Sequence, residues 1–131
     1  MRTILTSLLL ATAFLLASAV QAADPVKHVD ARAAAKLLKE NKYMVVLDIR
    51  RAVELEDGHI AGAKNIDFYG KDFADQLKAL DKEKPYLVHC ASGGRSTKSL
   101  ETFKQLGFKR VYHLDGGFNG WREAGQPVEK K

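Results

Sequence analysis

Residues 86–97 have the sequence YLVHCASGGRST, in which an apolar run leads directly into Cys90. The run over residues 86–89 is typical of a buried strand, and residues 96–106 have the spacing of an amphipathic helix. Ligand sites in open α/β sheets lie at the carboxyl ends of the strands. Cys90 therefore stands where a strand–loop–helix unit places a functional side chain.

The residues that follow Cys90 favour an ionised sulfur. Small residues at positions 91–94 let the backbone curl, so that its N–H groups can point inward as an anion-binding nest. The N-terminus of the following helix adds partial positive charge, and Arg95 adds a full one. An inert buried thiol is the ordinary interpretation of a lone cysteine, but these features together predict a nucleophilic thiolate with a lowered pKa. The predicted substrate-binding residues are Ala91, Ser92, Gly93, Gly94, Arg95 and Ser96.

On either side of this unit, strands alternate with helices. Short apolar runs predict further strands, and amphipathic or capped segments predict further helices. The strands are expected at 43–47, 63–66 and 110–114, and the helices at 30–40, 52–57, 72–80 and 118–124. This alternation predicts an α/β domain built on a mainly parallel sheet.

The composition fits one globular domain. The chain has 131 residues, of which 46% are hydrophobic and 28% are charged. These values exclude a disordered chain, a collagen-like repeat and a disulfide-dense miniprotein. The formal net charge is +5, with no run of five or more basic residues. The charge therefore indicates mild attraction for anions and does not favour nucleic-acid binding.

Residues 1–22 have the layout of a secretory signal peptide: a positive start, an apolar stretch over 4–16 and small residues before Ala22. The alternative is a membrane anchor, but the apolar stretch is shorter than the roughly 20 residues that cross a bilayer. We expect cleavage after Ala22, a single domain over residues 23–131, and a periplasmic protein without stable membrane association. In an exported chain with one cysteine, Cys90 cannot form an internal disulfide.

Three motifs resemble those of the rhodanese family, in particular its small, exported, single-domain members. They are LDIR at 47–50 followed by Glu54 and by GHIAGA at 58–63, CASGGRS at 90–96, and LDGG at 114–117 followed by Trp121 and by GQP at 125–127. The resemblance covers about residues 28–128. It implies a rhodanese-like three-layer fold, in which a five-stranded, mainly parallel sheet carries helices on both faces.

The resemblance also implies a thiosulfate sulfurtransferase, which moves sulfane sulfur through a persulfide on Cys90. A small anionic donor such as thiosulfate would load the cysteine, and a thiol or cyanide would discharge it. The chain has one cysteine and four scattered histidines, and it lacks the glycine motifs that bind phosphate or dinucleotides. We therefore expect no metal and no cofactor. A domain of this size can stand alone, so a monomer is expected.

Four residues are predicted to support the site rather than react: Asp48, Arg50, Glu54 and His59. Glu54 follows Arg50 at the four-residue spacing of a helical ion pair, and buried carboxylate–guanidinium pairs often fix loops. His59 follows a glycine at a turn, so a structural hydrogen bond is favoured over proton transfer. Strand alternation places His89 on the face opposite Cys90, which argues against a Cys–His pair between these neighbours.

Two other classes of function stay open. Cysteine phosphatases and arsenate reductases also place a cysteine at a strand end and an arginine at a helix start. Their spacing is C-x5-R, whereas Cys90 and Arg95 have the spacing C-x4-R, and this shorter loop suits a single sulfur atom better than a tetrahedral oxyanion. The second alternative is a non-catalytic sulfur carrier or a stress-related binding module. The sequence leaves the physiological donor, acceptor and protein partner undetermined.

Overall fold

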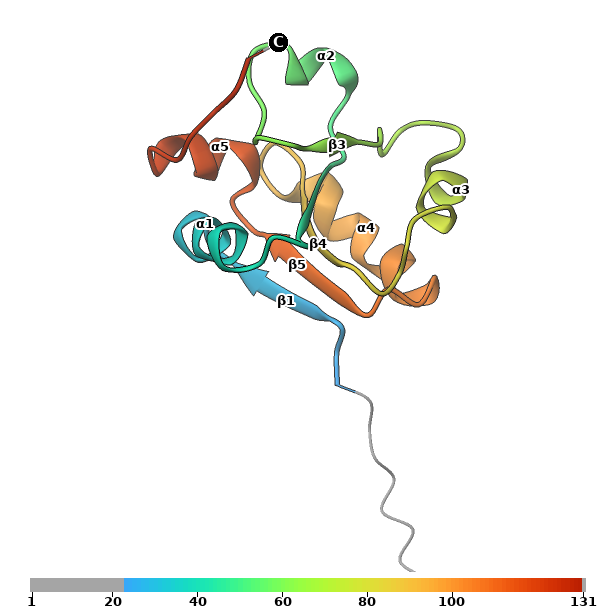
Figure 1. The fold of residues 1–131 in the computed structure, drawn as a ribbon. Helices are drawn as coiled ribbons and strands as arrows, with labels where there is room; N and C mark the ends of the chain where they lie inside the picture. The colour runs from blue at the N-terminus through green and yellow to red at the C-terminus, as the bar shows by residue number, and fades with distance from the viewer. Residues whose placement is uncertain (1–22, 131) are drawn as a thin grey trace, which may run out of the picture.

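A computed structural model describes residues 23–130, so the predicted signal peptide lies outside the described residues. Five parallel strands form one sheet in the order β1-β5-β4-β2-β3 (Figure 1). Their bounds are β1 Val26–Val29, β2 Val45–Asp48, β3 Lys64–Asn65, β4 Pro85–His89 and β5 Arg110–Leu114. Within residues 23–130, no helix is long and apolar enough to cross a membrane.

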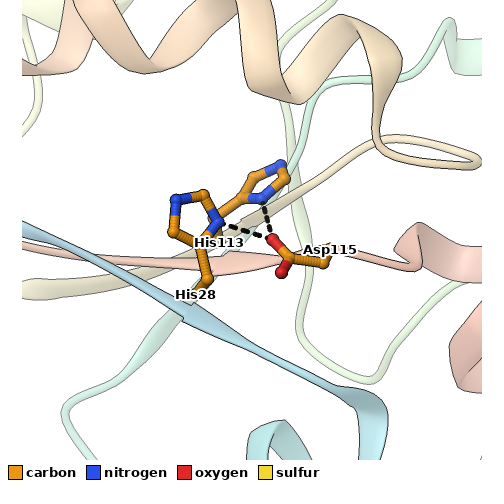
Figure 2. Close-up of side chains that lie close together, drawn as sticks. All are labelled: His28, His113 and Asp115. Atoms are coloured by element: carbon orange, nitrogen blue, oxygen red, sulfur yellow. Dashed lines mark hydrogen bonds and ion pairs between the residues drawn. The ribbon is translucent and has the colours of Figure 1, made fainter.

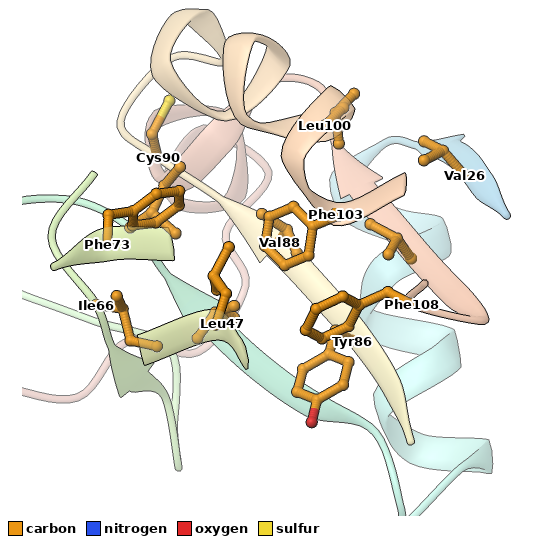
Figure 3. Packing of buried hydrophobic residues seen from close by; sticks show 13 residues of the cluster. Val26, Leu47, Ile66, Phe73, Tyr86, Val88, Cys90, Leu100, Phe103 and Phe108 are labelled. Atoms are coloured by element: carbon orange, nitrogen blue, oxygen red, sulfur yellow. The ribbon is translucent and has the colours of Figure 1, made fainter. Parts of the chain in front are cut away.

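Helices cover both faces of the sheet and give the three-layer α/β fold that the family resemblance implies (Figure 1). The helices are α1 Ala31–Glu40, α2 Ala52–Leu55, α3 Phe73–Lys78, α4 Gly94–Gln105 and α5 Gly117–Glu123. On one face, α3 and α4 contribute Phe73, Leu77, Leu100 and Phe103 to a core that also contains Val88 and Cys90 (Figure 3). On the other face, α1 and α5 contribute Ala34, Phe118 and Trp121.

The central strand β4 is buried along its whole length, because β5 and β2 flank it and helices cover both of its faces. Its side chains alternate between the two cores: Val88 lies in the core under α3 and α4, and Leu87 lies in the core under α1 and α5. Cys90 follows the last residue of this strand. The reactive loop therefore leaves the middle of the sheet at its carboxyl end.

The apolar pattern of the sequence does not identify β1, and only the family resemblance implies a fifth strand. Lys27 and His28 are exposed on this edge strand, so its four residues lack an apolar run. Pairing of Val26–Val29 with the neighbouring β5 maintains the strand. Hydrogen bonds to a neighbouring strand, together with the packing of Val26 and Val29 against the two cores, make this segment a strand, and a sequence pattern does not record such bonds.

Candidate active site

The sulfur of Cys90 is enclosed by hydrogen-bond donors from the loop and from the start of α4. Cys90 is only 1% exposed. Its Sγ atom accepts hydrogen bonds from the backbone N–H of Gly93 at 3.1 Å and of Ser96 at 3.4 Å. The Oγ atom of Ser96 lies 3.3 Å from the same sulfur. These contacts form the anion-binding nest that the small residues predict.

The N-terminus of α5 holds the loop in this conformation. The amides of Phe118 and Asn119 donate to the carbonyls of Cys90 and Ala91, each at 2.9 Å. The Nδ1 atom of His89 lies 2.9 Å from the Cys90 carbonyl, which only accepts, so this nitrogen donates. Both carbonyls accept hydrogen bonds from groups outside the loop. The loop amides can therefore face the sulfur.

The close approach of β5 makes Gly93 obligatory. Gly93 has φ +105°, and a Cβ atom there would lie 2.3 Å from the carbonyl oxygen of Asp115. Only glycine combines this left-handed conformation with such a contact. The loop after β4 and the end of β5 are therefore packed directly against each other.

The hydrogen bonds around the sulfur lower the pKa of Cys90. Burial opposes ionisation of the thiol, but the Ser96 hydroxyl and the amides of Ser96, Gly93 and Ser92 outweigh it. The result is a pKa below the ordinary cysteine value, as the sequence predicts. A lowered pKa increases the fraction of Cys90 that is a thiolate, and the thiolate is the nucleophilic form of cysteine.

Arg95 does not direct its guanidinium at the sulfur but forms a two-point ion pair with Glu54, with N···O distances of 2.8 and 2.9 Å. The backbone N–H of Arg51 also donates to the Glu54 carboxylate, at 2.9 Å. These contacts lower the pKa of Glu54 to about 2, against an opposing effect of burial. The expectation that Glu54 pairs with Arg50 is therefore wrong, and the positive charge of Arg95 is shared with a carboxylate.

Arg50 pairs instead with Asp48, and both side chains are almost fully buried. The Nη2 atom of Arg50 lies 2.8 Å from Oδ2 of Asp48 and 2.9 Å from the carbonyl oxygen of Gly58. Its Nη1 atom donates to the backbone carbonyl of Glu54, at 3.3 Å. These bonds tie the end of β2 to the segment that carries α2. Asp48 and Arg50 are therefore a buried pair between β2 and this segment, and their role in fixing the loop stays a prediction.

The remaining predicted residues lie away from the sulfur. His59 packs at the end of the α2 segment, with Nδ1 3.3 Å from the Leu55 carbonyl and Nε2 3.7 Å from the Glu129 carboxylate. His89 stacks on Phe118, on the face of the sheet opposite Cys90. Burial lowers the pKa of His89, which favours its neutral form.

Three residues without a role predicted from the sequence lie close together on β1, on β5 and directly after β5: His28, His113 and Asp115 (Figure 2). Oδ1 of Asp115 lies 2.6 Å from Nδ1 of each histidine. Nε2 of His113 lies 2.7 Å from Oγ of Ser96, so this cluster reaches the donors of the sulfur. Two of the four histidines therefore come together, contrary to the expectation that they are scattered. The sequence did contain a signal for this cluster. His113 and Asp115 are two positions apart at the end of an expected strand, a spacing that places two side chains on the same face.

Zinc sites use the same residue types, so the geometry of this cluster matters. Two ligands on one tetrahedral zinc ion are separated by about 3.3 Å, since each lies about 2.0 Å from the metal. The 2.6 Å separations in the cluster are shorter than this and lie close to the lengths of charge-assisted hydrogen bonds, about 2.7–2.9 Å. We therefore interpret the cluster as a hydrogen-bonded network.

Known proteins are similar to this chain in sequence and in fold. Residues 28–124 match the family of the rhodanese-like domain. The chain is 42% identical over 90 residues to a thiosulfate sulfurtransferase GlpE of Pseudomonas aeruginosa strain LESB58, a match that covers 69% of this chain and 79% of that protein. It is 34% identical over 87 residues to GlpE of Shewanella oneidensis, covering 66% of this chain and 84% of that protein.

Solved structures agree with these sequence matches. A rhodanese-related protein from Thermoplasma volcanium superposes with a TM-score of 0.69 at 34% identity, covering 80% of this chain and 99% of that one. A rhodanese-like domain protein from Staphylococcus aureus gives a TM-score of 0.68 at 28% identity, covering 80% and 98% of the two chains. Since the family match spans most of the chain and the parallel sheet agrees with these structures, the protein belongs to the rhodanese-like domain family.

Proposed function

We propose that the protein is a sulfurtransferase that carries sulfane sulfur as a persulfide on Cys90. The observation that supports this most directly is the buried sulfur, which two backbone amides and the Ser96 hydroxyl contact within 3.4 Å and whose pKa is lowered. The sequence matches to thiosulfate sulfurtransferases support the same class of reaction.

The proposed donor is thiosulfate or a similar small anion. The Cys90 thiolate attacks the outer sulfur of thiosulfate and forms a new S–S bond. The original S–S bond breaks, and its electron pair leaves with sulfite. In the second half-reaction, a thiolate or cyanide attacks the outer sulfur of the persulfide, and the Cys90 thiolate leaves. The result is ping-pong covalent catalysis without a change in net oxidation state.

The amides of residues 91–96 would stabilise both anionic forms of the cysteine. The loop already binds a sulfur atom with backbone and hydroxyl donors, and an outer persulfide sulfur carries a similar charge. In this proposal, Arg95 acts together with Glu54, because the guanidinium is held by the carboxylate. The pair connects α2 to the first turn of α4 beside the reactive loop.

A mass-spectrometric experiment tests the proposal. We expect thiosulfate to add one sulfur atom to Cys90, and a thiol or cyanide to remove it with multiple turnovers. Cys90→Ser should show no addition while keeping the wild-type melting temperature. Loading of Cys90 without turnover would favour the sulfur carrier. Cys90-dependent hydrolysis of p-nitrophenyl phosphate without sulfur uptake would favour the phosphatase class.

A further inference from the structure

A continuous chain of hydrogen-bonding groups connects the Cys90 sulfur to solvent. From Sγ of Cys90 it passes over 3.3 Å to Oγ of Ser96, and from there over 2.7 Å to Nε2 of His113. From Nδ1 of His113 it passes over 2.6 Å to Oδ1 of Asp115. His28 contacts the same carboxylate oxygen (Figure 2). Ser96 and His113 are buried, whereas the side chains of Asp115 and His28 are 56% and 55% exposed.

Asp115 determines which nitrogen of His113 carries a proton. An ionised carboxylate only accepts, so Nδ1 of each histidine must be the donor. Burial opposes ionisation of Asp115, but the hydrogen bonds from His28 and His113 outweigh it and keep the pKa of Asp115 below its ordinary value. In the neutral His113 ring, Nε2 is then unprotonated and faces the Ser96 hydroxyl.

The Ser96 hydroxyl has one strongly preferred acceptor. Its oxygen lies 2.7 Å from Nε2 of His113, compared with 3.3 Å from both the Cys90 sulfur and the Gly93 carbonyl. When the hydroxyl donates to the imidazole, its oxygen is free to accept the thiol proton of Cys90. The same three residue types act in this order in serine hydrolases, where an aspartate orients a histidine that takes a hydroxyl proton.

We propose that Ser96, His113 and Asp115 form a relay that removes the thiol proton of Cys90. The Cys90 S–H bond breaks as its proton moves to Oγ of Ser96. The Ser96 O–H bond breaks as its proton moves to Nε2 of His113. The products are a Cys90 thiolate and a His113 imidazolium, and the net charge of the site does not change. This inference deepens the proposed function, since it rests on a thiolate at Cys90 as the nucleophile.

The surroundings of His113 suit this role. Its titratable or charged neighbours are Asp115 directly after its own strand, His28 on β1, and Cys90 beyond Ser96. His89 also acts on this network electrostatically, and burial favours its neutral form. Arg95 is held by Glu54. Asp115 is thus the carboxylate that contacts His113, and it stabilises the imidazolium after proton transfer.

The first test is the pH dependence of Cys90 alkylation by iodoacetamide, measured in buffers that contain EDTA. His113→Gln keeps a hydrogen-bonding group near the position of Nε2 but cannot take up a proton. We expect the midpoint of its rate profile to move to higher pH, so that alkylation at a pH below the wild-type midpoint slows roughly tenfold, as a pKa increase of about one implies. His59→Gln is the matched histidine control and should keep the wild-type midpoint. An unchanged midpoint in His113→Gln would overturn the relay.

A serine pair on α4 supplies a second control. Ser96→Ala should raise the midpoint, and Ser96→Thr, which keeps a hydroxyl, should restore much of the difference. Ser99 is equally buried, but its hydroxyl donates to the Ser96 carbonyl and does not contact the sulfur. Ser99→Ala should therefore leave the midpoint unchanged. Equal shifts in Ser96→Ala and Ser99→Ala would contradict a specific role of the Ser96 hydroxyl.

Ring-nitrogen NMR shifts of His113 in the unsubstituted protein supply a readout that survives poor folding of a variant. At a pH just above the midpoint of Cys90 ionisation, His113 should be an imidazolium, and at the same pH in Cys90→Ser it should be neutral. A neutral His113 beside a wild-type thiolate would show that Ser96 is only a hydrogen-bond donor. These measurements need no sulfur transfer, so the relay and the proposed function can fail independently.

Discussion

The guanidinium of Arg95 and the carboxylate of Glu54 form a two-point ion pair between residues 41 positions apart in the sequence. Glu54 lies in α2, after β2, and Arg95 lies in the first turn of α4, after β4. β2 and β4 are neighbours, so their carboxyl ends bring these helices together. The pair therefore connects the two loops at the end of the sheet that carries Cys90. Because of this pairing, a substitution of Arg95 or of Glu54 affects both residues.

Arg95→Ala should raise the apparent Michaelis constant for thiosulfate. The substitution removes a positive charge and leaves the Glu54 carboxylate without its guanidinium partner beside the reactive loop, which an anionic donor must reach. A loss of about 1 kcal/mol, ordinary for a partly exposed pair, corresponds to roughly a fivefold increase. Steady-state kinetics provides the measurement. In the double variant Arg95→Ala/Glu54→Gln, much of the increase should disappear, because the unpaired carboxylate is also removed. If the single and double variants are equal, the effect comes from Arg95 alone.

Glu54 should also make the fold sensitive to acid. Its pKa is about 2 in the folded protein, compared with 4.5 for the ordinary group. A lowered carboxyl pKa stabilises the fold fully above pH 4.5 and loses this effect as the pH falls toward about 2. Thermal melts of wild type and Glu54→Gln should differ by a few degrees at neutral pH and converge over this acid range. A difference that persists at pH 2 would show that Glu54 acts through packing rather than charge.

Gly93→Ala should destroy the reactive loop. A Cβ at this position would collide with the Asp115 carbonyl and would also occupy a left-handed conformation. Gly107 is the matched control, because it has φ +84° but a Cβ there would meet no atom within 4 Å. Gly107→Ala should cost about 1–2 kcal/mol of stability and retain sulfur transfer. Gly93→Ala should cost more and lose transfer. Equal costs in the two variants would show that the close approach of β5 is unimportant.

The local parts of the site could be predicted from the sequence, and the long-range parts could not. The strand, the small-residue loop and the helix around Cys90 are consecutive, so their pattern predicts the nest directly. The predicted partner of Glu54 was wrong because a four-residue spacing suggested Arg50, whereas the sheet order places Arg95 nearby. His28 meets Asp115 only because β1 pairs with β5, and β1 carries no apolar pattern of its own.

The expected signal peptide gives a prediction about the protein in its native cell. Residues 1–22 should be removed, and the mature chain should begin at Ala23 in the periplasm or an equivalent exported space. N-terminal sequencing of the protein from fractionated cells provides the measurement. A cytosolic protein that retains Met1 would contradict export.

Arg50→Ala should unfold the protein more readily than any substitution of an exposed ion pair. Arg50 is 4% exposed and Asp48 is 0% exposed, so removal of the guanidinium leaves a buried carboxylate without its main partner. Breaking such a pair costs about 3–5 kcal/mol, a large part of the stability of a small domain. Lys36→Ala is the control, because its pair with Glu40 lies on the exposed surface of α1 and contributes at most about 1 kcal/mol. Urea titration of both variants measures the difference. An Arg50→Ala variant with wild-type stability but without sulfur transfer would move Arg50 from the scaffold to the group of residues that act on the substrate.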